Sequence, residues 1–530
     1  MQNIKLTIAL FLTSVILISS CQKETVVTEP FLESEKSHFQ EGMIQLGEKL
    51  NNPYTVENMR KAYQNITKHS QLKSSDITEA DIEVTHFYVR FLPKSERELG
   101  ILHHDTLLEL FDYPLDYEMH EGGTYYHDPN IPDTAITWQY TVVEKEFVFP
   151  VLEYEVLAEL FLPETMLDSK TLKSTEDWTF WDELEVEALK MTGNYEEAPS
   201  LKSTNGLIRK KWKPSGKIRV EDNSGLGYPP VIGCKVRAYS WFTIKSDLTD
   251  GEGKFYINHN FKGHVNYSIK WERNDFDIRS GNWGQAYFNG PRYKEKAWDQ
   301  IIWKSIGMSW VYAHIHRGAY TYYYANRWGI KTPPKNGGFL KTRIKIGAMD
   351  KSGRAHYYDF NKFFTTPQIK IYRKDSYGNE NSSGDLFETA VHELAHASHW
   401  EIGYTYGQYV VDAIFSEPFL PESWAQGVGV KITTDTYGYD WNTWQAKTTS
   451  SLKSNGGYTP IVWDMMDDYN QRDKKGSAYP IDRVKNYTLN QLEGALYGTN
   501  TWNGWRDNIK SKYPDNSTKD YLIELFKNYK

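Results

Sequence analysis

The stretch "ETAVHELAHASHW" at residues 388–400 sets the strongest constraint on the fold of this 530-residue chain. It brings His392, Glu393 and His396 close together in a chain that has only 15 histidines. On an α-helix, at roughly 100° per residue, the two histidines are about 40° apart around the axis and one turn apart along it. Both imidazoles could therefore bind one metal ion, with the Glu393 carboxylate beside them.

The surrounding residues predict that this stretch is a helix. Apolar side chains recur at the spacing of one helix face, at Phe387, Val391 and Leu394. Ser383 or Asp385 could cap the start of the helix, and Gly403 suits its C-terminal end.

The residue types favour zinc. Neutral imidazoles suit Zn²⁺, and catalytic zinc sites have three protein ligands and an open position for water. Zinc lowers the pKa of that water, and a neighbouring carboxylate can take its proton. We therefore predict a Zn²⁺ cofactor, with His392 and His396 as ligands and Glu393 as the catalytic base. Because the motif also arises by chance, a third ligand has to support it.

A second predicted helix, "FLPESWAQGVGVKITT" at residues 419–434, offers this ligand in its first turn. It carries Glu422 and, three residues later, the small residue Ala425. This pattern resembles the gluzincin family of zinc metallopeptidases, whose site is completed by a Glu on a second helix that closely approaches the first. The resemblance implies Glu422 as the third ligand. It covers roughly residues 293–530, but only the histidine motif and "ESWAQGV" are specific.

Other side chains compete for roles at this site. Asp412 and Glu417 are alternative third ligands, although Glu417 precedes a proline and is pushed toward extended structure. His399 lies about 10 Å along the helix from His392, so we expect it to support the site or the packing rather than share the ion.

A hydrogen-bond donor for the oxyanion of the reaction is expected after the third ligand. Tyr437, Tyr439 and Tyr458 follow it in the chain, and Tyr458 is preferred as a catalytic residue because it lies in a glycine-rich turn before a helix. Packing is the alternative role for each of them. His314 and His316 are expected to pack or to face the substrate rather than to form a second metal site.

The beginning of the chain has the features of a secretory signal. Residues 1–21 contain a lysine, a short apolar run and small residues before Cys21, which resembles a bacterial lipobox. The resemblance implies that Cys21 is lipidated and that the protein is anchored outside the cytoplasm, at the outer membrane or cell surface. A cleaved signal without lipid is the alternative. The polar residues 22–40 are expected to form a tether.

The rest of the chain predicts a multidomain α+β protein. Residues 41–200 mix helical and strand patterns and form an N-terminal α/β region of unknown role. Residues 213–290 have short strands broken by turns, which predicts a small β-sandwich, and they resemble carboxypeptidase regulatory-like domains of the transthyretin type. Residues 291–530 are expected to be a zincin-like α+β catalytic domain.

The charge and composition of the chain limit the classes of molecule that it is expected to bind. The 61 basic and 69 acidic residues are interspersed, which excludes a nucleic-acid-binding block. The expected substrate is a protein or peptide, and the 38 Tyr and 18 Trp residues would also allow contact with glycans. A non-catalytic binding lipoprotein is the main alternative function. A third possibility makes residues 22–200 an inhibitory pro-region.

Overall fold

The computed structural model describes most of the chain after the predicted signal and tether. It describes residues 42–69, 77–105, 107–167, 180–196, 211–282, 284–337, 343–358, 367–403, 419–440, 447–453 and 457–529. Cys21, Asp412 and Glu417 lie outside these ranges, so the predictions made for them stay predictions. Among the described residues, no helix has both the length and the apolar character needed to cross a bilayer.

The N-terminal region combines small antiparallel sheets with helices. Its elements are β1 (Gln45–Lys49), α3 (Val56–His69), η1 (Glu79–Asp81), β2 (His86–Phe91), α4 (Glu96–His104), β3 (Tyr117–Glu121), β4 (Gln139–Glu144), β5 (Tyr154–Leu160), η2 (Pro163–Leu167) and α5 (Phe180–Met191). One sheet has the order β4-β2-β5, and β1 pairs with β3. Thr55 starts α3 by accepting a hydrogen bond from Asn58 N at 3.2 Å.

Two sheets follow in the middle of the chain. Their strands are β6 (Ser215–Val220), β7 (Lys235–Ser240), β8 (Thr243–Leu248), β9 (Lys254–Tyr256), β10 (Val265–Lys270), β13 (Tyr287–Tyr293) and β14 (Trp298–Ile302). The sheets have the orders β13-β10-β7-β8 and β14-β6-β9. Alternate residues such as Ile218, Val236 and Ile269 are buried in one shared core. The predicted β-sandwich is therefore formed, although β14 comes after residue 290.

A third sheet, with both parallel and antiparallel strand pairs, underlies the metal motif. It has the order β12-β11-β15-β17-β16, from β11 (Phe276–Ser280), β12 (Gly284–Gln285), β15 (Ile344–Ser352), β16 (His356–Tyr357) and β17 (Ile369–Lys374). β11 pairs in parallel with β15, from Phe276 opposite Ile344 to Ser280 opposite Ala348. Strands from both sides of residue 290 thus share one sheet.

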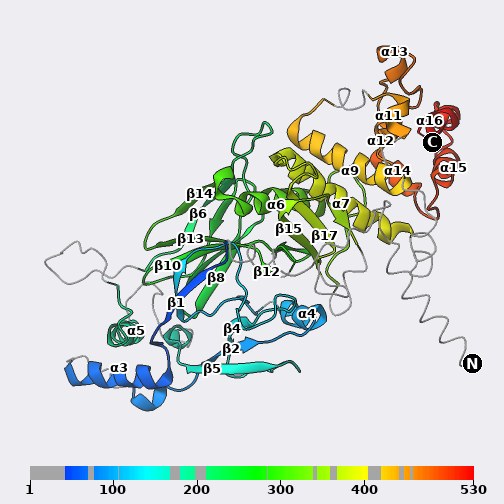
Figure 1. Ribbon diagram of the computed structural model, residues 1–530. Helices are drawn as coiled ribbons and strands as arrows, with labels where there is room; N and C mark the ends of the chain where they lie inside the picture. The colour runs from blue at the N-terminus through cyan, green and yellow to red at the C-terminus, as the bar shows by residue number, and fades with distance from the viewer. Residues whose placement is uncertain are drawn as a thin grey trace, which may run out of the picture.

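Helices cover this sheet and extend to the C-terminus. They are η3 (Lys304–Ile306), α6 (Met308–Tyr324), α7 (Ser383–Gly403), α9 (Phe419–Tyr437), α11 (Thr449–Lys453), α12 (Ile461–Met466), α13 (Gln471–Lys475), α14 (Leu489–Gly494), α15 (Trp502–Lys512), η5 (Lys519–Tyr521) and α16 (Leu522–Lys527). α7 packs against both α6 and α9. In Figure 1 the small C-terminal helices lie beyond α9, at the opposite end of the molecule from α3 and α5. The described chain is thus a multidomain α+β protein, as predicted.

The sandwich and the N-terminal region meet through a hairpin. Phe242, at the turn between β7 and β8, packs on Tyr54 and Tyr88 with ring centroids 5.9 and 4.9 Å apart. Trp241, at the same turn, has a φ of 52°, which is unusual for a bulky residue. It lies against Tyr54 at 6.2 Å. The hairpin therefore belongs to the core of the N-terminal region.

Candidate metal centre

The metal motif lies on α7, whose apolar stripe is buried as predicted. Phe387, Val391 and Leu394 have almost no exposed surface. The start of the helix is capped by Ser382 and not by Ser383, and the predicted Asp385 takes part in this cap. Its hydroxyl accepts a hydrogen bond from Asp385 N at 3.2 Å, and the Asp385 carboxylate accepts one from Ser382 N at 2.9 Å.

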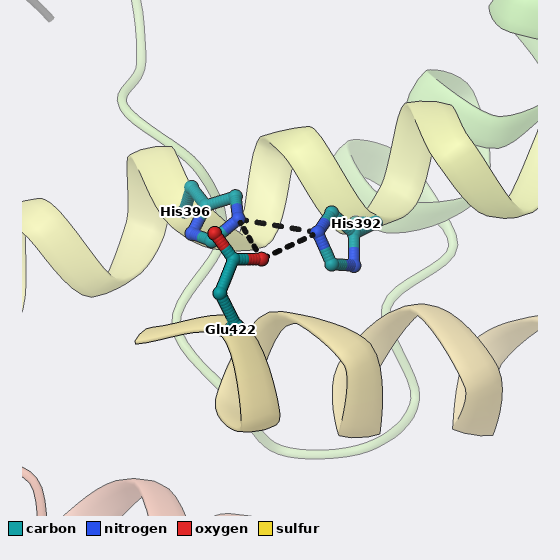
Figure 2. A group of neighbouring side chains, drawn as sticks. All are labelled: His392, His396 and Glu422. Atoms are coloured by element: carbon teal, nitrogen blue, oxygen red, sulfur yellow. Dashed lines mark hydrogen bonds and ion pairs between the residues drawn. The ribbon is translucent and has the colours of Figure 1, made fainter. Parts of the chain in front are cut away.

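Three side chains from α7 and α9 converge at one point. His392 Nε2 and His396 Nε2 are 3.1 Å apart. Glu422 Oε2 lies 3.5 Å from the first and 3.4 Å from the second. Figure 2 shows the carboxylate reaching from α9 toward both rings. These three residues form a group that could hold a metal ion, the only such group among the residues described.

Small residues allow the helices around this site to approach closely. Ala425 and Gly429 lie on α9, and a Cβ atom at Gly429 would stand 3.3 Å from His392 Cβ. On the other side of α7, a Cβ atom at Gly318 of α6 would stand 2.6 Å from the carbonyl oxygen of Phe387. Gly429 and Gly318 thus allow α9 and α6 to approach α7 closely, and Ala425, the small residue expected on α9, is buried.

The polar atoms of the site fit a cation. Glu393 Oε2 is buried and has no hydrogen-bond partner, and Glu422 Oε2 is buried at 3.5 and 3.4 Å from the imidazole nitrogens of His392 and His396. An anionic oxygen in such a place costs free energy unless a positive charge or a donor compensates it. Two imidazoles and one carboxylate are also the donor set that zinc accepts. A zinc ion would be held by His392, His396 and Glu422, and its positive charge would compensate the neighbouring Glu393 carboxylate.

The surroundings of the two carboxylates separate their pKa values. Burial raises the pKa of Glu393 to about 8, partly offset by His396. Burial also acts to raise the pKa of Glu422, but the two histidines more than offset it and the pKa falls well below its usual range. Burial lowers the pKa of His392, whereas Glu422 more than offsets burial at His396 and raises its pKa. The Glu422 carboxylate is therefore stabilised in its ionised form by the two histidines, and it favours the protonated form of His396.

The three candidate tyrosines take different positions. Tyr458 stacks on the His392 ring, with centroids 5.9 Å apart and planes at 24°. Burial raises its pKa, and the nearby Glu422 and Glu393 raise it further. Tyr437 instead donates a hydrogen bond to Asp222 at 2.9 Å, and Tyr439 donates one to Ser224 O at 3.0 Å. Of the three, Tyr458 is the one whose ring stacks on a histidine of the metal-binding group.

The remaining histidines near the motif have packing roles. His399 is buried, and burial lowers its pKa to about 3. His314 and His316 lie on α6 and bond through Nε2 to the carbonyl oxygens of Glu221 and Ile232, at 3.0 Å each. Both belong to the contact between α6 and the sandwich.

Glu388 is a member of this neighbourhood that sequence reasoning missed. It lies one turn before His392, and its Oε1 atom accepts a hydrogen bond from Gln426 Nε2 of α9 at 3.1 Å. Burial raises its pKa to about 7. Its spacing of four residues from His392 was the available signal, because it places both side chains on one helix face.

Searches against models of protein families and against curated proteins find no match for this chain.

Proposed function

We propose that this chain is a zinc-dependent metallopeptidase that hydrolyses proteins or peptides outside the cytoplasm. The observation that carries the proposal is the convergence of His392, His396 and Glu422, whose ligand atoms lie within 4.8 Å of one another. Glu393 lies directly beside this group with a buried, unpartnered oxygen. A metal site with an adjacent free carboxylate is what hydrolysis by an activated water requires.

Each side chain has a distinct role in the proposed reaction. A bound zinc ion supplies Lewis acidity, which acidifies water and polarises a carbonyl group. Glu393 accepts the proton of the attacking water and passes it to the leaving amine. We propose Tyr458 as the donor of a hydrogen bond to the oxyanion, a role that the stacking of its ring on His392 supports. The burial of the carboxylates strengthens these interactions, because the local dielectric is low.

The alternative of a purely binding lipoprotein requires the metal group to be inactive. Glu393 argues against it, because a carboxyl group that is buried beside the ligands with an unpartnered oxygen contributes nothing to zinc binding itself.

We also propose that a lipid on Cys21 anchors the chain. Release of a Cys21→Ser variant from membrane fractions checks the anchor, and unchanged membrane association contradicts it.

Two measurements test the proposed activity. The purified chain should contain about one zinc per molecule, since three protein ligands bind the ion tightly. It should also cleave a mixed peptide library, and a chelator should stop the cleavage. Zinc content near zero after growth in zinc-rich medium contradicts the metal site. Full zinc without cleavage of any peptide or protein points to the binding alternative.

A further inference from the structure

A loop of the sandwich lies against the start of the metal-binding helix α7. We call residues 222–227, between β6 and β7, the capping loop. Asn223 Oδ1 accepts a hydrogen bond from Ser383 N at 2.8 Å, and Ser224 Oγ accepts one from Gly384 N at 2.9 Å. The first N–H groups of a helix have no partner within the helix. The capping loop supplies partners for two of them, from 160 positions earlier in the chain.

The capping loop is held in shape by the carboxylate of Asp222. Its Oδ1 atom accepts hydrogen bonds from Ser224 N at 2.9 Å and Leu226 N at 3.3 Å. Its Oδ2 atom accepts hydrogen bonds from Arg317 at 3.1 Å and from Tyr437 at 2.9 Å. One oxygen thus shapes the loop, and the other contacts α6 and the end of α9.

The neighbouring residue adds two further contacts with α6. The carbonyl oxygen of Glu221 accepts a hydrogen bond from Trp310 Nε1 at 2.7 Å and lies 3.0 Å from His314 Nε2. Asp222 itself is almost fully buried, so its bonds to Arg317 and Tyr437 do not compete with solvent. The three helices that surround the metal group all meet the sandwich at this point.

The contact between the capping loop and the helices bears on the metal group because α7 and α9 pack in an antiparallel arrangement. Phe387, near the start of α7, contacts Tyr437, at the end of α9, with centroids 5.5 Å apart. The same two helices carry His392 and Glu422, whose ligand atoms have to meet within a few ångström. A shift of α7 along α9 therefore separates the ligands, because helices move as rigid bodies.

We propose that Asp222 and its capping loop are positioning residues for the metal centre, so that the sandwich fixes the register of α7 against α9. This inference rests on the proposed function, because the ligands that the loop would position are those of the proposed zinc site. It assigns the sandwich a part in metal binding, whereas its sequence alone indicates an accessory domain.

The chain contains a matched control for this loop. Asp250 lies in another turn of the sandwich, and its Oδ1 atom accepts hydrogen bonds from Glu252 N at 2.8 Å and Lys254 N at 2.9 Å. These are the same i+2 and i+4 positions that Asp222 serves. The Asp250 turn is exposed, and these two hydrogen bonds of the Asp250 side chain stay within the turn.

The test compares the capping loop with the control turn in the full chain. The variants are Asn223→Ala with Ser224→Ala, its conservative counterpart Asn223→Asp with Ser224→Thr, Asp222→Asn, and Asp250→Asn as control. Two quantities are measured at a temperature where all variants are folded by circular dichroism. One is hydrogen exchange in metal-free protein, for peptides that span the first turn of α7. The other is the zinc dissociation constant, by competition with a chelator.

We expect the double alanine variant to exchange its first-turn amides about tenfold faster and to bind zinc about tenfold more weakly, the usual scale for groups that orient metal ligands. The conservative pair should restore both, because Asp and Thr can accept the same hydrogen bonds. Asp222→Asn should weaken zinc binding to a similar extent, since an amide nitrogen cannot accept from Arg317. Asp250→Asn should change neither quantity.

The two readouts separate the ways in which the inference can fail. Unchanged exchange in the alanine variant would show that the loop does not hold α7. Faster exchange with zinc affinity equal to that of the control would show that the loop caps the helix without positioning the ligands, which also overturns the inference. If the wild-type chain binds no zinc, the proposed function fails, while hydrogen exchange still decides whether the loop holds the helix.

Discussion

Glu393 and Glu422 are two buried carboxylates beside one proposed ion, and their surroundings predict opposite consequences of the same substitution. Glu422 lies within ion-pair distance of both histidines, whereas Glu393 has a raised pKa of about 8 and an unpartnered oxygen. We therefore expect Glu422 to bind the metal ion and Glu393 to take the proton of the attacking water.

Glutamine at each position should reveal this difference. Glu393→Gln removes the proton acceptor but keeps all three ligands, so zinc should stay while hydrolysis falls at least about a hundredfold. Glu422→Gln replaces a charged ligand, so zinc affinity and activity should fall together. Zinc content and turnover are measured on the same preparations. Full zinc and full activity in Glu422→Gln would move the third ligand elsewhere, with Glu417 and Asp412 next to test.

A buried acid outside the metal-binding group predicts how the stability of the fold varies with pH. Asp464 is fully buried and accepts hydrogen bonds from Gln471 and Tyr529. Burial raises its pKa from 3.8 to about 8. The folded chain therefore keeps a proton that the unfolded chain releases above about pH 4. The stability that this proton gives is present at low pH and is lost as pH rises toward 8.

Asp464→Asn mimics the protonated acid and should remove this dependence. Between pH 5 and 7 the metal-free wild type should lose up to about 1.4 kcal/mol per pH unit more than the variant. Urea unfolding of both proteins at pH 5, 6 and 7 measures the difference, to which the buried Asp482 also contributes, because Asp464 helps to raise its pKa. Parallel curves for the two proteins would mean that Asp464 is ionised in the folded chain.

At the scale of elements, the close contact of α6 and α7 depends on one glycine. Alanine at position 318 would place its Cβ atom 2.6 Å from a backbone oxygen of α7, so one helix has to move. Gly318→Ala should lower the free energy of unfolding by about 1 to 3 kcal/mol, even though alanine favours helices. Gly251→Ala, which meets open space, is the control in urea unfolding. Equal midpoints for the two variants would contradict the close contact.

The helices of the site and the strands β15 and β17 could be predicted from sequence, but the pairing of the strands beneath the helices could not. The histidine spacing and the apolar stripe of α7 are local signals, and they led directly to His392, Glu393 and His396. β11 has a strand pattern like its neighbours in the sandwich, yet it pairs with β15. A strand's pattern indicates which face is buried and not which strand it pairs with. The contacts of Asn223 and Ser224 were missed for the same reason, because their partners are distant in sequence.

At the scale of the whole molecule, the N-terminal region is attached to the sandwich by shared core residues. Tyr239, Phe242 and Tyr287 of the sandwich are buried in the same core as Tyr54 and Tyr88. An inhibitory pro-region that is released by cleavage would expose this aromatic surface to water. The structure thus favours a permanent part of the fold over a removable segment.

A chain that begins at residue 211 tests this point. It should be less stable than the full chain and prone to association, because it exposes Tyr239, Trp241 and Phe242. Urea unfolding and light scattering measure both effects, and peptide hydrolysis is assayed in parallel. A shortened chain that is equally stable and more active would support the pro-region instead.

The distance in sequence between the capping loop and α7 also has a consequence for the order of folding. The first turn of α7 finds two of its hydrogen-bond acceptors 160 positions upstream. Closing such a long loop has an entropic cost that local helix formation does not repay by itself. During refolding, the N-terminal turn of α7 should therefore become protected only after the sandwich has formed. The competence to bind metal would then appear in the slowest phase, however fast the helix itself forms.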